Sequence, residues 1–401
     1  MDFSLTKEQQ ELKATFEAFF MEAMKKAPPE YLKGGLEACY ETDEGFAFHR
    51  HMQKRLGEKG WLSMAWPREY GGQEAPIINQ LLFNETREAS GCPGYDVMGC
   101  AMFAPTLLVS ASEEQKRRLL PPIAKGEVQY CQGWSEPDAG SDLANLSTIA
   151  IKDGDEYVVN GQKTWTSAAD RSECIFLLAR TDPNSKRNKG LSMFHVDMKT
   201  PGIEIRPLYL MNGHSRIYND VYFKDVRIPG RDLIGGEGNG WAVTQNTMNF
   251  ERSGIGYFAA CEKELNKVIE YAKHTKRNGI YLSKDPVIRQ KIARLYSDLI
   301  AGKMLAYRVA CEQEKGGLIM AASTASESKV FGSELNKRII ALATEIMGLY
   351  GMVESSLWSP MGESVGLHQM APALTIAAGS NEIQRSIIAW IGLKQPRYKL
   401  K

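Results

Sequence analysis

Residues 130–167 are the part of the chain richest in side chains that can do chemistry as well as pack. Their first part, 130–142, is predicted to be a turn-rich loop, because its proline fixes φ, its glycine permits positive φ and its Ser and Asp side chains can bond local backbone. Backbone N–H groups and hydroxyls exposed in such a loop suit a planar, acceptor-rich ring or a phosphate. The second part, 160–167, places an indole beside two hydroxyls at the end of a predicted strand. Each part alone is more typical of a structural loop or a core tryptophan, but together they favour a ligand site.

The two parts form a pair of motifs. They read Ser135-Glu136-Pro137-Asp138-Ala139-Gly140-Ser141-Asp142 and Asn160-Gly161-Gln162-Lys163-Thr164-Trp165-Thr166-Ser167. This pair resembles the flavin-binding segments of the acyl-CoA dehydrogenase family, T/S-E-P-x-A-G-S-D followed later by N-G-x-K-x-W-I-T/S. The resemblance extends over nearly the whole chain and implies an FAD cofactor.

The same resemblance assigns roles to residues within the motif pair. It implies that Gln132, Trp134 and Ser135 lie beside the flavin, and that Trp165 and Ser167 pack on it and bond to it. Ser141 belongs to the cofactor-binding stretch at the point where that stretch meets the CoA substrate.

The catalytic base is the next residue that the resemblance implies. The family removes the α-proton of an acyl-CoA thioester while a hydride leaves the β-carbon for the flavin, so a carboxylate must lie near the α-carbon. Its commoner position is the Glu of Y-E-G-T-x-x-I-Q-R, where this chain has Ala378. The other position is a Glu just before an Arg on the helix after the β domain, matched by Glu251 and Arg252. The resemblance therefore indicates Glu251, whereas by itself an adjacent acid and base is typical of a solvated helix face.

The remaining contacts are also carried by resemblance. Arg252 matches a residue near the CoA chain and the base, and Asn249 matches an Asp that bonds the pantetheine in some relatives. The backbone N–H of Ala378 matches the group that bonds the thioester carbonyl. Ser380 and Glu382 match residues that hold the adenosine pyrophosphate of FAD.

Asp96 is a second candidate base. It interrupts the apolar start of a predicted helix over 94–110, which matches the pocket-lining helix of the family. A few members that act on cyclic substrates take an acid from this neighbourhood. The alternative is structural, because an aspartate in the first turn of a helix is stabilised by the helix dipole.

Two segments depart from the family pattern. The R-x-x-F-G loop reads Lys276-Arg277-Asn278-Gly279, and the Q-x-x-G-G/x-x-G segment has Glu345 in place of Gln. In the family both grip the ADP half of FAD from a neighbouring subunit. Contacts to that half are therefore the least specified by the resemblance.

Composition excludes several classes of function. The net charge is +1 with Lys and Arg dispersed, which argues against a nucleic-acid groove. No apolar run is long enough for a membrane span, and the N-terminal residues lack the pattern of a signal peptide, so we expect a cytoplasmic protein. The seven scattered cysteines include no C-x-x-C, and the six histidines show no ligand spacing. We therefore expect reduced thiols and no metal site.

Periodicity predicts an α+β fold in three segments: a helical domain over 1–127, a β-barrel or sandwich over 128–236 and a helical bundle over 237–401. Strands are predicted within 150–159, which has an Asp-Gly turn, and over 174–180, 191–197, 203–208 and 220–228. Helices are predicted over 6–27, 43–60, 77–88, 94–110, 112–120, 241–273, 286–314, 321–350 and 381–391. Capping boxes are predicted at Thr6 with Gln9 and at Ser112 with Gln115, and Pro121-Pro122 is predicted to end its helix.

These features predict an FAD-dependent acyl-CoA dehydrogenase that forms a homo-oligomer, a tetramer by resemblance, and passes electrons to an electron-transferring flavoprotein. Loss of the loop Glu at position 378 leaves room beside the α-carbon, which favours a branched, cyclic or aryl-bearing acyl group. Two alternatives stay open: an acyl-CoA oxidase that uses oxygen, and a non-catalytic binding or assembly relative.

Overall fold

The computed structural model describes residues 4–29, 31, 38–213, 215–250, 254–316, 318–353, 361 and 364–397, without the side chains of residues 249, 250, 318–321 and 364. Contacts between residues divide the chain into two compact units. The first comprises 1–34, 76–92 and 252–401, and the second comprises 35–75 and 93–251. The predicted boundaries after residues 127 and 236 stay a prediction.

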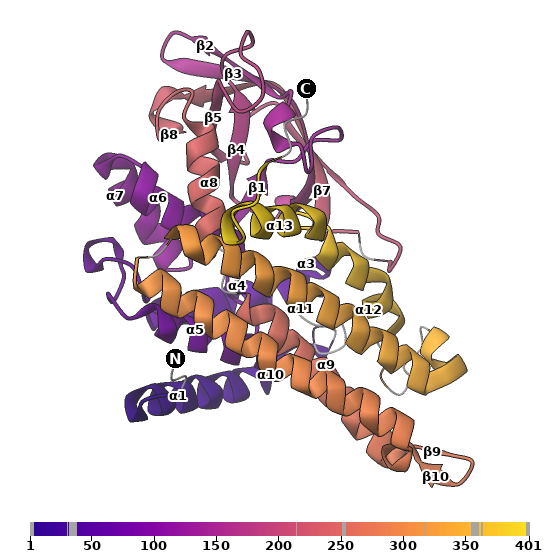
Figure 1. The fold of residues 1–401 in the computed structure, drawn as a ribbon. Coiled ribbons are helices and arrows are strands. Elements are labelled where there is room, and N and C mark those ends of the chain that lie inside the picture. The colour runs from indigo at the N-terminus through magenta and orange to yellow at the C-terminus, as the bar shows by residue number, and fades with distance from the viewer. Residues whose placement is uncertain are drawn as a thin grey trace. The chain divides into compact units, whose positions relative to one another are not determined.

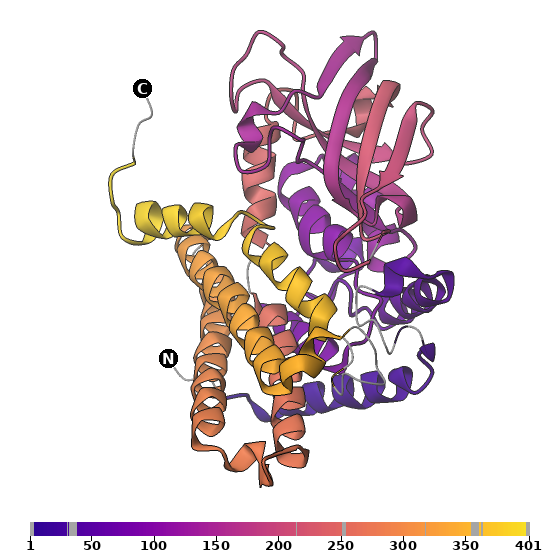
Figure 2. The same ribbon diagram turned by 90° about the vertical axis from the view of Figure 1, so that its right-hand side faces the viewer.

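The first unit is a bundle of helices in which α9, α10 and α11 run side by side (Figures 1 and 2). Helix α10 begins at Pro286 as predicted, because Asp285 accepts from Val287 N–H and Pro286 has no N–H to satisfy. Its helices and short strands are α1 (Lys7–Met24), α5 (Ile77–Ser90), α9 (Ile255–His274), β9 (Lys276–Arg277), β10 (Ile280–Tyr281), α10 (Pro286–Glu314), α11 (Leu318–Met347), α12 (Ser364–Met370) and α13 (Asn381–Ile387).

A buried charge cluster joins four of these helices. The carboxylate of Glu85 on α5 is 3% exposed and lies 2.7 Å from Lys303 Nζ of α10 and 3.4 Å from Lys13 Nζ of α1. It also accepts from the Tyr307 hydroxyl at 2.9 Å, and Lys303 contacts Glu262 of α9 at 2.8 Å. Burial opposes ionisation of Glu85, but Lys303 and the other partners outweigh it and lower the pKa. The cluster therefore stays ionised and fixes α1, α5, α9 and α10 to one another.

The second unit combines helices with one eight-stranded sheet. Its helices are α3 (Ala38–Glu41), α4 (Asp43–Glu58), α6 (Ala104–Ser110), α7 (Glu113–Ala124) and α8 (Gly240–Phe250). Its strands are β1 (Tyr130–Gly133), β2 (Ile149–Asp153), β3 (Glu156–Ser167), β4 (Cys174–Arg180), β5 (Leu191–Asp197), β6 (Ile203–Pro207), β7 (Tyr218–Pro229) and β8 (Leu233–Ile234).

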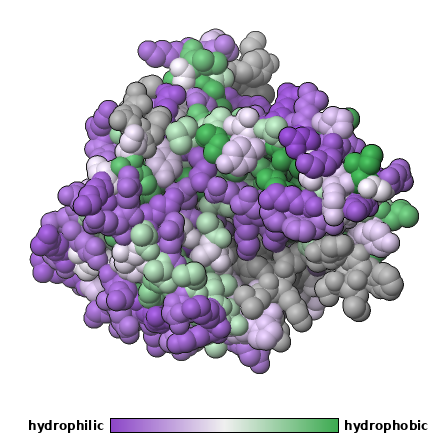
Figure 3. Space-filling view, turned by 90° about the horizontal axis from the view of Figure 1, so that it is seen from below, coloured by the Kyte–Doolittle hydropathy of each residue, from purple (hydrophilic) through white to green (hydrophobic). Residues whose placement is uncertain are grey.

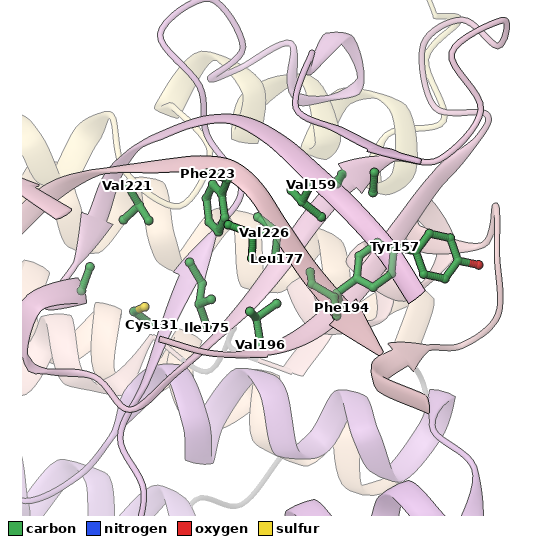
Figure 4. Close-up of a cluster of buried hydrophobic side chains, with 14 residues drawn as sticks. Cys131, Tyr157, Val159, Ile175, Leu177, Phe194, Val196, Val221, Phe223 and Val226 are labelled. Carbon is green, nitrogen blue, oxygen red and sulfur yellow. The ribbon is translucent and has the colours of Figure 1, made fainter. Parts of the chain in front are cut away.

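The sheet folds around one apolar core. Its strand order is β6-β7-β3-β2-β4-β5-β8, and β1 pairs in parallel with β4. Side chains of β3 and β7 meet side chains of β4 and β5 in one buried cluster, which includes Val159, Phe223, Leu177 and Phe194 (Figure 4). The predicted β-rich middle segment and the α+β fold are confirmed.

Local sequence signals located most elements. Three predictions differ from the structure: the proline stop of α7, the loop over 130–133 and the single helix over 241–273. Both capping boxes form: Gln9 N–H and Gln115 N–H each donate to the hydroxyl of the cap residue at 3.2 Å. The Pro121-Pro122 stop was wrong, because α7 continues to Ala124 while the two proline carbonyls accept from Lys125 and Glu127 N–H.

The loop prediction was wrong for residues 130–133, which pair as β1 with a strand some 40 residues later in the sequence. The predicted single helix over 241–273 was also wrong. It is divided into α8 and α9, and α9 begins after Gly254, whose φ of +68° lies in the left-handed region.

No helix in the described ranges is long and apolar enough to cross a membrane. On the face shown in Figure 3, hydrophobic residues form small patches separated by hydrophilic ones.

Candidate functional site

A buried ion pair joins the two motifs of the second unit. Lys163 on β3 is fully buried, and its ammonium lies 2.8 Å from the Glu136 carboxylate and donates to the Trp134 carbonyl at 3.0 Å. Glu136 also accepts from Ser147 N–H at 2.6 Å and from Thr148 N–H at 2.9 Å. The two motifs therefore form one structure, with the first loop attached to the strand that carries the second motif.

Both members of this pair are charged at neutral pH. Burial opposes ionisation of Glu136, but Lys163 and the donors from Thr148 and Ser147 outweigh it and lower its pKa to about 2. Burial also lowers the pKa of Lys163, to about 8, against the attraction of Glu136. The attraction between the two groups therefore keeps the ion pair intact at pH 7.

Gln132 and Trp134, close to the ion pair in the sequence, each carry a side-chain N–H donor that is buried without a partner in the described part of the chain. Trp134 is 6% exposed and packs edge-on against Phe176, with the ring centroids 5.8 Å apart. Within the described residues, Gln132 Nε2 and Trp134 Nε1 are buried without a hydrogen-bond partner. Because unpartnered buried donors are costly, their presence on neighbouring residues favours a ligand with acceptor atoms here.

Trp165 presents an exposed indole at the end of β3. Its side chain is 59% exposed, and its backbone has a φ of +57° where the register between β3 and β7 shifts. A bulky residue in the left-handed region is a strained feature. Tyr218 on β7 packs edge-on against it at 5.9 Å, and Asn219 Nδ2 donates to the Thr166 carbonyl at 3.3 Å. The strand end thus leaves one aromatic surface exposed.

The remaining residues of the two motifs occupy the loop and the strand end. The Ser135 carbonyl accepts from Thr164 N–H at 2.9 Å, which pairs the loop with β3. Ser141 is exposed in the turn that follows, and Ser167 is the last residue of β3. All six predicted motif residues, 132, 134, 135, 141, 165 and 167, therefore lie on the joined structure that the ion pair holds.

Asp96 lies in a buried hydrogen-bond chain. Gly94 N–H donates to His49 Nδ1 at 3.2 Å, so the proton of this neutral ring is on Nε2, which donates to Gln129 Oε1 at 3.1 Å. Gln129 Nε2 donates to Asp96 Oδ1 at 3.1 Å, and Tyr130 N–H donates to Oδ2 at 2.9 Å. Both carboxylate oxygens of Asp96 are thus already bonded, and they fix the start of β1.

Burial also makes Asp96 a weak acid. The residue is 0% exposed. It directly precedes the π-helical segment Val97–Phe103 in the sequence. Burial raises its pKa to about 7, although N–H groups of Gly99 and Tyr130 oppose the rise. Burial and hydrogen bonding therefore explain Asp96 as a residue that positions β1, with no contact to substrate required.

We expect Asp96→Asn to change the pH dependence of stability. The pKa of Asp96 in the folded protein lies above its ordinary value of 3.8, so the folded state holds the proton more tightly than the unfolded state. The wild type should lose stability relative to the variant as pH rises from about 4 to 7, by at most about 1.4 kcal/mol per pH unit. Urea unfolding of both proteins at pH 5, 6, 7 and 8 measures this, and parallel profiles would contradict it.

Helix α8 leads directly to the predicted base. Thr106 on α6 donates to the Thr247 hydroxyl at 2.8 Å, and Asn246 Nδ2 donates to Ser110 at 3.2 Å. These bonds fix α8, whose last residue directly precedes Glu251 in the sequence. Glu251 and Arg252 lie outside the described residues, as does the side chain of Asn249.

The late loop belongs to the first unit. Ala378 has a φ of +54°, and Ser380 caps α13 by accepting from Ile383 N–H at 3.4 Å. Glu382 lies in the first turn of α13, where its own N–H and Ser380 lower its pKa. The structure thus brings Ala378, Ser380 and Glu382 together at one turn.

Comparison with known proteins covers all three segments. The models described as the N-terminal, middle and C-terminal domains of acyl-CoA dehydrogenase match residues 6–127, 131–226 and 238–392. The chain belongs to the acyl-CoA dehydrogenase family. It is thus an oxidoreductase of the acyl-CoA dehydrogenase type, and membership implies a flavin cofactor.

Relatives and solved structures agree along the full length. Acyl-CoA dehydrogenase FadE26 of Mycobacterium tuberculosis is 32% identical over 406 residues, which cover 99% of both chains. A structure described as the Tcur3481-Tcur3483 steroid ACAD is 30% identical, with a TM-score of 0.87 over 99% of this chain and 100% of that one. The ChsE4-ChsE5 complex from Mycobacterium tuberculosis is 33% identical, with a TM-score of 0.85 and the same coverage.

The residues of the second unit fit a flavin. A flavin ring is planar and rich in acceptor atoms, which matches the unpartnered donors Gln132 Nε2 and Trp134 Nε1 and the exposed indole of Trp165. Two other residues of the motifs, Glu136 and Lys163, face each other and hold these candidate contacts in place.

Sequence reasoning missed the residues that hold the site together. Glu136 and Lys163 belong to the two motifs but were not predicted to pair, although an acid and a lysine in paired motifs can signal an ion pair. His49 and Gln129 had no such signal, because their partners lie 33 to 80 positions away in the sequence.

Proposed function

We propose that the protein is an FAD-dependent acyl-CoA dehydrogenase, with FAD as the flavin implied by its family. The observation that supports this most is the joining of the two flavin motifs through the buried Glu136–Lys163 pair, next to unpartnered donors. The bound flavin would accept a hydride from the β-carbon of the substrate. Gln132 and Trp134 would donate to its ring, Trp165 and Ser167 would cover and bond to it, and Ser380 and Glu382 would hold its pyrophosphate.

The protein's own residues would activate the substrate. Glu251 takes the α-proton on its carboxylate, and Arg252 stays at the edge of the site as a fixed charge. Ala378 N–H donates to the thioester carbonyl, whose oxygen gains negative charge as the proton leaves. Asn249 bonds the pantetheine, and Ser141 meets the CoA chain.

A basic loop beside Ser141 supports a CoA thioester. The guanidinium of Arg180 donates to the carbonyls of Ala144, Ser185, Arg187 and Lys189 at 3.0–3.3 Å. It thus holds the exposed segment 184–190, which carries three basic side chains, against the end of the first motif loop. Such a segment suits the phosphates of CoA.

We propose a branched, cyclic or aryl-bearing acyl group. The alanine at position 378 leaves space that a glutamate side chain would fill, and a solved relative is described as a steroid ACAD. Anaerobic titration of the purified yellow protein with isobutyryl-, cyclohexanecarbonyl- and 3-phenylpropionyl-CoA tests this. Bleaching of the flavin by one of them supports the proposal, and no bleaching by any acyl-CoA favours the non-catalytic alternative.

The electron acceptor separates the proposed dehydrogenase from an oxidase. We propose an electron-transferring flavoprotein as acceptor, in the cytoplasm, where the free cysteines, five of the seven buried, stay reduced. Stopped-flow mixing of the substrate-reduced protein with air-saturated buffer tests this. Reoxidation of the flavin by oxygen within the time of one turnover would indicate an oxidase.

We expect Trp165→Ala to weaken FAD binding by about 1–3 kcal/mol, because the indole contributes dispersion and excludes water from the ring. Equilibrium dialysis and the flavin absorption spectrum measure the loss. Ile151→Ala, another exposed apolar side chain of the same sheet, is the matched control. Unchanged FAD content and an unshifted spectrum in Trp165→Ala would remove Trp165 from the site.

We also expect the FAD-loaded protein to be an oligomer, a homotetramer by the resemblance, and FAD to stabilise it. Light scattering of the protein with and without FAD measures the mass. A stable FAD-loaded monomer would contradict the expectation. If the protein loads FAD only after a second, different acyl-CoA dehydrogenase chain is added, the oligomer is a hetero-complex of the ChsE4-ChsE5 kind and not a homotetramer.

A further inference from the structure

Lys329 of α11 is a buried lysine whose ammonium contacts the late loop. The residue is 7% exposed, and Nζ donates to the Gly379 carbonyl at 3.0 Å and to Asn381 Oδ1 at 2.9 Å. Ser333, one turn further along α11, donates to the same Asn381 oxygen at 3.2 Å. Lys329 therefore joins α11 both to the loop and to the first residue of α13.

The loop that Lys329 contacts has a strained backbone. Ala378 and Gly379 follow each other with φ values of +54° and +77°. A residue with a Cβ, such as Ala378, is strained in this region, and such conformations persist only where the surroundings enforce them. Two side chains do so here: Lys329 binds the Gly379 carbonyl, and Gln384 Nε2 donates to the Ala378 carbonyl at 2.7 Å.

These two contacts leave the N–H donors of the turn available. Both carbonyls of the turn are bonded, whereas the N–H groups of Ala378 and Gly379 have no backbone acceptor in the described part of the chain. The direction of the Ala378 N–H depends on the φ of Ala378, which the bonds to the two carbonyls of the turn help to hold. A change at Lys329 therefore acts on Ala378 without altering its side chain.

We propose that Lys329 is a positioning residue, which holds the turn of Ala378 and Gly379 so that Ala378 N–H meets the thioester carbonyl. Lys329 thereby affects the rate of proton removal more than the affinity for acyl-CoA. The proposal rests on the proposed function. The carbonyl oxygen carries more charge in the transition state than in the bound substrate, so a misplaced donor costs more in rate than in binding.

The test uses the full-length, flavin-loaded Lys329→Met protein and the acyl-CoA that bleaches the wild-type flavin fastest. We expect the rate of flavin reduction at saturation to fall about 10- to 100-fold, with the dissociation constant changed less than about threefold. Lys329→Arg, which keeps charge and donors, should recover part of the rate. Lys303→Met, which removes a half-buried, ion-paired lysine of the same unit, should lower the melting temperature but keep the rate. Wild-type reduction in Lys329→Met, or an equal loss in Lys303→Met, would overturn the proposal.

Hydrogen exchange gives a second readout that needs no substrate. Backbone amides of residues 377–385 should exchange faster in Lys329→Met than in wild type or Lys303→Met. If no acyl-CoA reduces the wild-type flavin, the proposed function fails while exchange still tests the positioning role. Unchanged exchange in these peptides would overturn that role.

Discussion

Glu251→Gln is expected to reduce the rate of flavin reduction by about two to four orders of magnitude or more, while acyl-CoA still binds. Glutamine keeps the shape of the side chain but accepts no proton, and general-base catalysis supplies an effect of this size. A carboxylate close to apolar acyl carbon would have a raised pKa, which brings its basicity nearer to that needed at neutral pH. Anaerobic stopped-flow absorbance of the flavin, with a separate binding titration, distinguishes lost chemistry from lost binding.

Two further variants test the location of the base. Asp96→Asn should keep flavin reduction within about tenfold of wild type, because both oxygens of Asp96 are already bonded to Gln129 and Tyr130. The double variant Glu251→Ala with Ala378→Glu should recover part of the rate if both positions face the same α-carbon. If Asp96→Asn abolishes reduction while Glu251→Gln leaves it nearly intact, the assignment of Glu251 is wrong.

Lys163→Met is expected to destabilise the protein by about 3–5 kcal/mol and to release the flavin. Methionine fills similar space, but it leaves the Glu136 carboxylate buried without its cation. The folded-state pKa of Glu136, about 2, lies below its ordinary value of 4.5. Its ionised form therefore stabilises the wild type above about pH 4.5, and that stability is lost as pH falls towards 2.

Denaturant unfolding and flavin fluorescence of Lys163→Met measure both losses. Lys163→Met combined with Glu136→Gln removes both charges and should be less destabilising than the single variant. The acid-side loss of stability should also shrink in the double variant. A single variant within about 1 kcal/mol of wild type would show that the pair does not hold the two motifs together.

Elements with strong local signals could be predicted from the sequence. The start of α10 follows from Asp285 and Pro286, and the hairpin of β2 and β3 from the Asp153-Gly154 turn, because these residues act on their own backbone. The strand β1 could not be predicted in this way. Its partner β4 lies about 40 residues later, and parallel pairing leaves no turn in the sequence to indicate it.

The sequence by itself determined the family and the α+β fold and nominated the flavin contacts, because motif residues and hydrophobic periodicity are local properties. Only the tertiary structure decided that Glu136 faces Lys163, that Asp96 is enclosed by Gln129 and Tyr130, and that Lys329 reaches the Gly379 carbonyl. Each of these contacts joins residues 27 to 50 positions apart in the sequence. Charge and burial make each contact strong, but side-chain type alone does not name the partner, because the partner is set by how the helices and strands pack.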